Sequence, residues 1–375
     1  MVRPGISVLL STHQSLLANR RAGVFTQVSG VLPDLRSSVD ALLSVADVRV
    51  LFSPEHGLHG AAAEGEHIAD AMHPAGLPIY SLYSTHVAPT AEQLSDVDVI
   101  VCDVQDIGCR FYTYAWTLLL LIEAAAKAGV AVIVADRPNP IGGLVEGPGI
   151  EAAYRTIVGL HDVPIRHGLT LGELVLLVNA EQGWECALTV VPCEGWQRYQ
   201  RWSATMLPWV PPSPNMPTAE TTLIYPGTCL LEGINVSVGR GTAKPFEWLG
   251  APWIDGAALA AELNTHHLPG VGWRQVAFVP CSGPYAGTIC SGVQPHVINA
   301  DNFRPVMAGV ALTMAIQRLY PEQLNWNIAH FDRLAGSAQL REQICADVPL
   351  TDIVAGWQPD NEYFRTRSAS VLLYD

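Results

Sequence analysis

The chain has 375 residues, of which 49% are hydrophobic and 15% charged, and it contains 32 Gly and 27 Pro. This composition is typical of a compact globular protein of about two domains and excludes a disordered or fibrous chain. With 35 acidic against 21 basic residues, the formal net charge is −14, so the broad positive field that nucleic acid or an anionic membrane requires is missing. We therefore expect no nucleic-acid partner and no membrane insertion.

No segment resembles an export signal or a membrane span. The apolar stretch after Met1 is short and is ended by Ser11-Thr-His, and the longest apolar run, Leu118 to Ile122, is far below the ~20 residues that cross a bilayer. We expect a cytoplasmic protein for the chain as given, or a periplasmic or secreted one if a leader has been removed. Oligomeric state does not follow from the sequence.

The 8 cysteines do not form a metal-binding pattern. Cys102 and Cys109 are seven residues apart, as are Cys186 and Cys193, whereas zinc knuckles use much closer pairs. Buried free thiols are the expected state in a long chain without an export signal. The phosphate-loop, dinucleotide, Gly-x-Ser-x-Gly and His-Glu-x-x-His motifs are also missing from the sequence. We expect neither a metal nor a cofactor.

Short apolar runs alternate with helical segments through the first half. The predicted strands lie at 23–26, 48–52, 77–81, 97–102 and 130–135, with helices near 35–43 and 112–128. Strands that are apolar throughout predict a parallel sheet buried on both faces, which is the doubly wound, Rossmann-like α/β plan.

A further helix and a proline-rich break follow. Thr170 and Glu173 have the spacing of a capping box, so a helix is expected to begin there. The stretch from Pro208 to Pro217 has five prolines in ten residues and marks a boundary. We predict an N-terminal Rossmann-like domain at 1–208 and a smaller α/β domain at 209–375.

Polar segments follow three of the predicted strands. They begin at Ser53-Pro-Glu-His-Gly, Asp103-Val-Gln-Asp-Ile-Gly-Cys-Arg and Asp136-Arg-Pro-Asn-Pro. In open parallel sheets, ligands bind beyond the carboxyl ends of the strands. The three segments are therefore expected to meet at one rim and to form an active site.

Acidic residues after the second strand are the first catalytic candidates. Glu55, beside His56, follows a predicted buried strand. A partly dry cleft at this point would suit a carboxyl group that acts as general acid or base. The alternative role for Glu55 is to cap the next helix. Glu64, Glu66 and His67 lie in a loop rich in Gly and Ala. This loop could close over a substrate, or its acidic side chains could simply be exposed to solvent.

The next two polar segments offer binding groups. Asp103, Asp106 and Arg110 form an acid-acid-base cluster that suits a sugar acid, with a structural ion network as the alternative. Further candidates for the same rim are Asp136, Arg137, Asn139, Glu146 and His167, although rigid turns and a buried structural histidine would explain the same residues. Later polar stretches held by Pro or Gly add Asn215, Glu232 and Arg240.

Taken together, these segments resemble the exo-β-N-acetylmuramidase family (NamZ type, glycoside hydrolase family 171). The matching stretches occur in order along nearly the whole chain and begin at Phe52, Asp103, Asp136, Glu146, Arg166, Trp209, Tyr225 and Gly239. The resemblance implies a second domain packed across the cleft of the first. It also implies removal of terminal N-acetylmuramic acid from the non-reducing end of peptidoglycan fragments.

Such a reaction usually needs two carboxyl groups. We expect Glu55 to be one, with Glu66, Glu146 or Glu232 as the second, unless the substrate's acetamido group takes that part. Arg110 or Arg240 would bind the lactyl carboxylate.

Tyr112 and Tyr114 would contact the sugar ring. The alternative functions are a non-catalytic binding protein for muropeptides or amino sugars, and an amidase or esterase acting on wall fragments.

Overall fold

The computed structural model spans Met1 to Asp375 and describes every residue except Glu64, Ser84 and Thr85. Its larger sheet has seven strands in the order β3-β4-β2-β1-β5-β6-β7, and all neighbouring pairs are parallel except β3 with β4. The strands are β1 Arg21–Thr26, β2 Asp47–Ser53, β3 Ala71–Met72, β4 Pro78–Ser81, β5 Val99–Asp103, β6 Ala131–Ala135 and β7 Leu188–Val191. The predicted doubly wound, mostly parallel sheet is confirmed.

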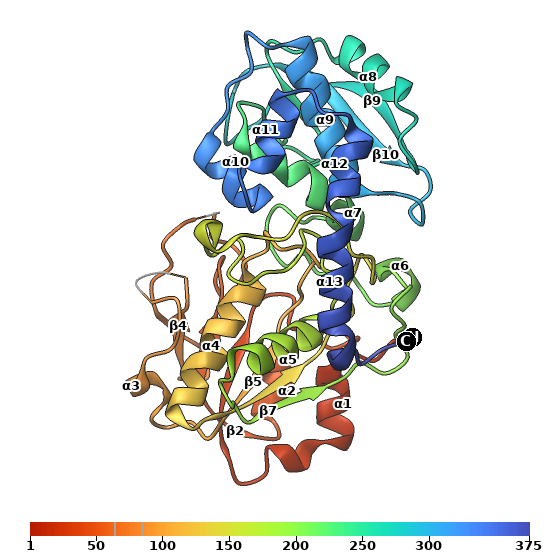
Figure 1. Ribbon diagram of the computed structural model, residues 1–375. Coiled ribbons are helices and arrows are strands. Elements are labelled where there is room, and N and C mark those ends of the chain that lie inside the picture. Colours follow the sequence, from red (N-terminus) through yellow and green to blue (C-terminus); the bar gives the residue numbers. More distant parts are fainter. Residues whose placement is uncertain (64, 84–85) are drawn as a thin grey trace.

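Helices cover both faces of this sheet (Figure 1). α1 (Gly5–Thr12) and α2 (Ser38–Leu43) pack on one face, and α3 (Ala91–Leu94), α4 (Tyr114–Ala128) and α5 (Leu171–Gln182) pack on the other. Side chains alternate across a strand, so Val99 and Val101 of β5 face α1 while Ile100 and Cys102 face α4. The continuous apolar runs in the sequence follow from this burial on both faces.

Local signals place the ends of the long helices. The Thr170 side chain accepts a hydrogen bond from the Glu173 backbone N–H, and the Glu173 carboxylate accepts one from the Thr170 N–H, which confirms the capping box. α4 and α5 both end at a glycine in the left-handed region, Gly129 and Gly183. α1, α3, β3 and β7 were not predicted from the sequence.

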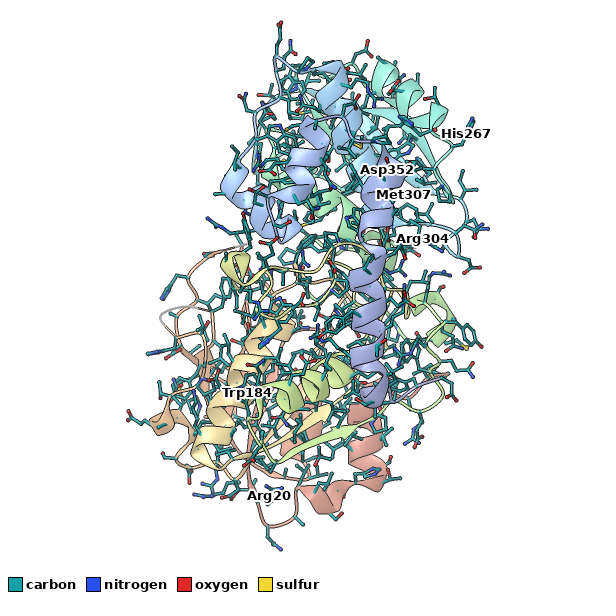
Figure 2. The ribbon with its side chains drawn as sticks, in the orientation of Figure 1. Arg20, Trp184, His267, Arg304, Met307 and Asp352 are labelled. Atoms are coloured by element: carbon teal, nitrogen blue, oxygen red, sulfur yellow. The ribbon has the colours of Figure 1, made fainter. Side chains whose placement is uncertain are left out.

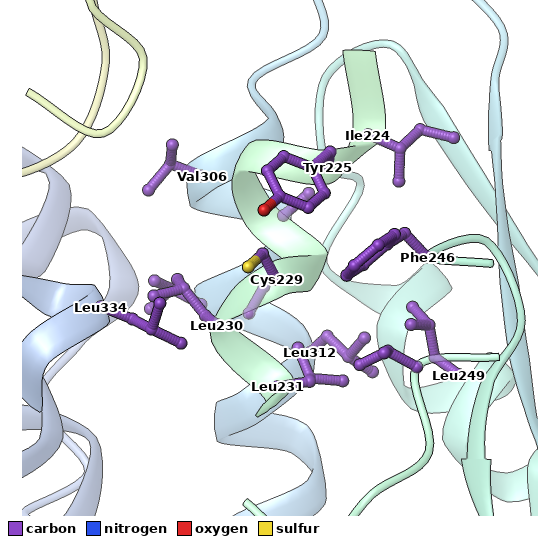
Figure 3. Close-up of a cluster of buried hydrophobic side chains, with 14 of the residues drawn as sticks. Ile224, Tyr225, Cys229, Leu230, Leu231, Phe246, Leu249, Val306, Leu312 and Leu334 are labelled. Carbon is purple, nitrogen blue, oxygen red and sulfur yellow. The ribbon is translucent and has the colours of Figure 1, made fainter. Parts of the chain in front are cut away.

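The second part of the chain builds a three-stranded antiparallel sheet, in the order β8-β10-β9. Its strands are β8 Leu249–Ala251, β9 Val271–Phe278 and β10 Cys290–Val297. The remaining helices are α6 Trp202–Thr205, α7 Ala219–Thr228, α8 Gly256–Thr265, α9 Pro305–Leu319, α10 Ile328–Ala335, α11 Gln339–Cys345, α12 Leu350–Gly356 and α13 Gln358–Ser368. Short 3-10 helices are η1 Gln14–Leu16, η2 Ala152–Tyr154, η3 Cys229–Gly233 and η4 Ala369–Val371. Figure 3 shows the core of this part, built around η3 and α9.

The apolar core of the second part extends across the junction into the first part. Ile107 and Phe111, which follow β5, belong to the same buried cluster as Leu230 and Val306 of the second part. At this junction the Met307 backbone N–H, at the start of α9, donates to the Glu146 carboxylate (2.8 Å; Figure 2 labels Met307). A large apolar interface of this kind opposes free movement of the domains.

The end of the chain returns to the first sheet. α13 descends along the first part (Figure 1). Its Phe364 is buried in the same apolar cluster as side chains of α4 and α5. Tyr374 then packs against Trp196, beside Val2 near the start of the chain. The domain division at residue 208 stays a prediction, and α13 shows that residues beyond 357 pack on the first domain.

All eight cysteines are free thiols, and six of them are buried, as expected. Within the described residues, no helix combines the length and the apolar character that crossing a membrane requires.

Candidate functional site

A cavity of about 210 Å³ lies where the carboxyl ends of β2 and β5 meet α7 and η3 of the second part. Most of its walls come from the turn after β2, the segment that leads into α4, the proline-rich stretch at 213–216 and the face of the second domain that carries η3. The cavity is smaller than the roughly 300–1,000 Å³ of pockets for drug-sized ligands, so it suits one ring and its substituents.

Glu55 is the carboxylate on the first-domain wall. It follows β2, and the residue is 7% exposed. Its Oε2 accepts a hydrogen bond from the Thr113 hydroxyl (2.7 Å), and its Oε1 accepts one from the Gly65 N–H (3.2 Å). The next residue, His56, has a φ of 70° and its Nδ1 lies 2.8 Å from the Ala62 carbonyl oxygen. A non-glycine residue in the left-handed region marks a sharp, constrained turn, which here holds Glu55 at the cavity.

A second carboxylate lines the cavity from the other domain. Tyr225, Cys229 and Glu232 are spaced at helical intervals along α7 and η3, so they share the face that lines the cavity. Glu232 accepts a hydrogen bond from Nε of Arg240 (2.7 Å), and the Arg240 guanidinium lies 4.8 Å from the centre of the Phe246 ring. The resulting wall combines an ion pair with an aromatic face.

Close packing of two helices allows this placement of α7. A Cβ on Gly227 would overlap the backbone of α9 at Pro305, and a Cβ on Gly309 of α9 would overlap Gly227. The glycines therefore let α7 cross α9 at backbone contact, which sets Tyr225 and Glu232 against the first domain. The Tyr225-Pro-Gly-Thr sequence is explained by this crossing.

Polar side chains from the segment before α4 and from the proline-rich stretch complete the cavity. Tyr112 lines it beside Ser213 and Asn215, and burial raises the pKa of the Tyr112 hydroxyl well above its usual range. Tyr114 packs on Tyr112 with ring centres 4.6 Å apart, but its hydroxyl donates to the Pro212 carbonyl. Tyr114 therefore supports Tyr112 and does not line the cavity.

Of the residues proposed from the sequence, six line this cavity: Glu55, His56, Tyr112, Asn215, Glu232 and Arg240. The other eleven described candidates lie outside its lining, most of them buried behind it: Glu66, His67, Asp103, Asp106, Arg110, Tyr114, Asp136, Arg137, Asn139, Glu146 and His167. Of the three polar segments expected to meet at one rim, those after β2 and β5 line the cavity, whereas the one after β6 does not.

Asp103 and Arg137 fill the point where the strand order reverses. Arg137 donates from Nε and Nη2 to the two carboxylate oxygens of Asp103 (2.6 and 2.8 Å) and from Nη2 to the Val31 carbonyl (2.8 Å). The Thr26 hydroxyl donates to the Asp103 backbone carbonyl. In many open sheets this crevice holds the ligand, whereas here a buried ion pair occupies it.

Asp106 and His167 form a buried pair behind Tyr112. Burial raises the pKa of Asp106 to about 7 and lowers that of His167 to about 3. The Leu169 N–H donates to Nδ1 of His167, which leaves the proton on Nε2, 3.8 Å from the Asp106 carboxylate. The Gly108 N–H holds the same Asp106 oxygen at 2.7 Å.

Arg110 and Glu146 connect segments and do not face the cavity. The Arg110 guanidinium donates to the carbonyls of Pro148, Val163 and Leu334, each at 2.8 Å, and burial lowers its pKa to about 10. Its proposed role in binding a lactyl carboxylate conflicts with this placement, because the guanidinium lies outside the cavity lining and donates to backbone carbonyls of both domains. Burial raises the pKa of Glu146, whose Oε1 accepts the Met307 N–H.

The third polar segment is also structural in this arrangement. Asp136 accepts hydrogen bonds from the Tyr374 hydroxyl (2.6 Å) and the Gly172 N–H (2.8 Å), and burial raises its pKa to about 6. Asn139 donates to the Leu169 carbonyl (2.9 Å). The C-terminal tail thus covers the end of β6, where Asp136 and Asn139 were expected to bind the substrate.

The loop after Glu55 contains the remaining candidates. Glu66 is exposed, and its carboxylate accepts the Ala63 N–H of its own loop (2.7 Å), which makes it a turn residue here. Glu64 lies outside the described residues.

Sequence reasoning missed several cavity residues, among them Thr113, Tyr225, Phe246 and His330. Thr113 and Tyr225 lie within the motifs that carry the family resemblance, so their position was visible although their role was not. His330 comes from α10 with no local signal, and burial lowers its pKa. Among the residues that the structure describes, no group of three His, Cys, Asp or Glu side chains is arranged to hold a metal ion.

The chain matches known families and structures along its whole length. The N-terminal family model of exo-beta-N-acetylmuramidase NamZ matches residues 22–220, and the C-terminal one matches 223–374. The peptidoglycan beta-N-acetylmuramidase NamZ of Bacillus subtilis (strain 168) is 41% identical over 378 residues, covering 100% of this chain and 91% of that protein.

Two crystal structures of DUF1343 family proteins from Bacteroides fragilis NCTC 9343 are also similar. They superpose with TM-scores of 0.92 and 0.80, at 34% and 30% identity, and each comparison covers 100% of this chain and 99% of the other.

Proposed function

Because this chain belongs to the exo-beta-N-acetylmuramidase NamZ family, we propose that it is a glycoside hydrolase that releases terminal N-acetylmuramic acid from the non-reducing end of peptidoglycan fragments. The observation that carries the proposal is the placement of Glu55 and Glu232 in the walls of one cavity, on opposite sides of the domain junction. A cavity of about 210 Å³ suits a single terminal sugar better than an internal stretch of glycan.

Glu55 is the proposed general acid or base. A glycosidic bond breaks through a charged, oxocarbenium-like transition state, and a carboxyl group beside the bond moves the proton of the leaving oxygen or of the attacking water. Glu55 is buried and held by two hydrogen bonds, which supplies the fixed position that such transfer requires. Among the candidates for a second carboxyl group, Glu232 is the one that lines the same cavity.

Arg240 is the proposed contact for the lactyl carboxylate of muramic acid. The guanidinium lines the cavity, and its pairing with Glu232 and its position over Phe246 fix its plane. An arginine in a fixed plane can bind a carboxylate through two parallel hydrogen bonds. His56, Tyr112 and Asn215 are the proposed partners of the sugar hydroxyl and acetamido groups.

The test is mass spectrometry of products from defined wall fragments, together with turnover of a chromogenic N-acetylmuramic acid glycoside. Release of N-acetylmuramic acid is expected, and Glu55→Gln should lower the rate about 10²- to 10⁴-fold, the contribution typical of acid–base catalysis. Glu123→Gln, on the outer side of α4, is the matched control and should keep full activity.

Other outcomes would overturn the proposal. Loss of acetyl or peptide groups with the glycan intact would assign the chain to the amidases or esterases. Tight binding by calorimetry with no product would make it a binding protein. Full turnover by a folded Glu55→Gln variant would remove Glu55 from the mechanism.

A further inference from the structure

Thr113 lies at the start of α4, but its side chain does not cap that helix. Its backbone carbonyl accepts the first helical hydrogen bond, from the Thr117 N–H (3.0 Å), which is the position of an N-cap residue. Threonine at such a position usually turns its hydroxyl back to its own helix. Here the hydroxyl instead donates to Oε2 of Glu55 at 2.7 Å, 58 residues earlier in the chain.

The other carboxylate oxygen is held from a different direction. The Gly65 N–H, in the loop that follows β2, donates to Oε1 of Glu55 at 3.2 Å. A carboxylate offers about four acceptor positions, so two such bonds fix its plane and still leave acceptor positions for a substrate. Thr113 and Glu55 are each 7% exposed, and both line the cavity.

The turn that precedes Thr113 is held by hydrogen bonds on both sides. The Tyr112 N–H donates to the Cys109 carbonyl (3.0 Å), and the Trp116 indole N–H donates to the Arg110 carbonyl (2.7 Å), so the turn before α4 is tied to the first turn of the helix. The described residues of the loop that carries Gly65 are mostly exposed. Thr113 is therefore the firmer of the two contacts to Glu55.

We propose that Thr113 is a positioning residue for the catalytic carboxyl group, which orients Glu55 through the Thr113 hydroxyl and has no contact with the bond that is broken. This inference rests on the proposed function. Catalytic groups must be held within about 0.5 Å of the productive geometry, and a displacement of about 1 Å costs on the order of 10²-fold in rate. A side chain of the same shape without the hydroxyl should therefore impair turnover while leaving the fold intact.

The experiment compares Thr113→Val, Thr113→Ser and Thr313→Val in the full-length chain, with the chromogenic glycoside as substrate. Thr313 is the matched control, because it is buried in α9 and its hydroxyl donates to the Gly309 carbonyl of its own helix (2.9 Å). Thr113→Val is expected to lower kcat about 10- to 100-fold at unchanged KM. Thr113→Ser should restore most of the lost kcat, and Thr313→Val should match the wild type.

The outcomes separate this inference from the proposed function. A wild-type chain that releases no sugar refutes the function itself. An active wild type with equal kcat for Thr113→Val and Thr313→Val refutes the positioning role, as does a serine variant no better than the valine one. If Thr113→Val does not fold, Thr113→Ala compared with Thr113→Ser decides the same question.

Discussion

Replacing Asp106 by asparagine should make the protein progressively more stable, relative to wild type, as the pH rises. Burial raises the pKa of Asp106 to about 7 from an ordinary value near 3.8. Between the unfolded and the folded pKa, this carboxyl group is protonated in the folded state and ionised in the unfolded state. It therefore stabilises the fold fully below the unfolded pKa, and this stabilisation is lost as the pH rises through the folded pKa. Asparagine stays neutral, so the variant escapes this loss.

The magnitude follows from the linkage slope. Each pH unit between the two pKa values is worth about 1.4 kcal/mol, so the wild type should lose about 3 kcal/mol from this group between about pH 5 and pH 8. His167 acts in the opposite sense, because its pKa is lowered to about 3 and its contribution is lost as the pH falls. That effect is present in both proteins and cancels in the difference between them.

Urea unfolding of both proteins across this pH range measures the difference directly. The groups that face Asp106, namely His167, Cys109, Tyr112 and Asp136, remain in the variant, so the comparison isolates one ionisation. Glu322→Gln, the same kind of substitution at an exposed position, serves as the control. A stability difference that stays constant from acid to neutral pH would refute the reasoning.

Three further predictions concern the tail, the segment before α4 and the cavity. Tyr374→Phe removes the hydroxyl bound to Asp136 and should lower the free energy of unfolding by about 1.5–3 kcal/mol with kcat unchanged, as measured by urea unfolding and turnover. Gly108→Ala should reduce both stability and kcat, because Gly108 has a φ of 74° and an added Cβ would overlap the Asn139 amide; a wild-type melting temperature would contradict this. Arg240→Gln should raise KM for muramic acid glycosides at least tenfold, and should affect glycosides without the lactyl group much less, in steady-state kinetics.

The sequence by itself determined the layered sheet, because β-branched apolar runs of about five residues that alternate with helical segments are typical of parallel strands buried on both faces. It also determined the capping box at Thr170 and the acidic turn at Glu55, since each of these depends on neighbours only a few residues away. Which polar residues face the cavity depended on contacts between distant segments. Asp136 accepts a hydrogen bond from Tyr374, 238 residues later in the chain, and Arg110 donates one to the Leu334 carbonyl.

Only the tertiary structure decided which strand-end groups were left for a ligand. A charged side chain beyond a buried strand must be satisfied by some partner, and the sequence does not say whether that partner is a substrate or another part of the chain. Asp103 pairs with Arg137, whereas the Glu55 carboxylate accepts hydrogen bonds from a hydroxyl and a backbone N–H and lies beside an open cavity. The second domain supplied the opposite wall, because the close crossing of α7 and α9 placed Glu232 there.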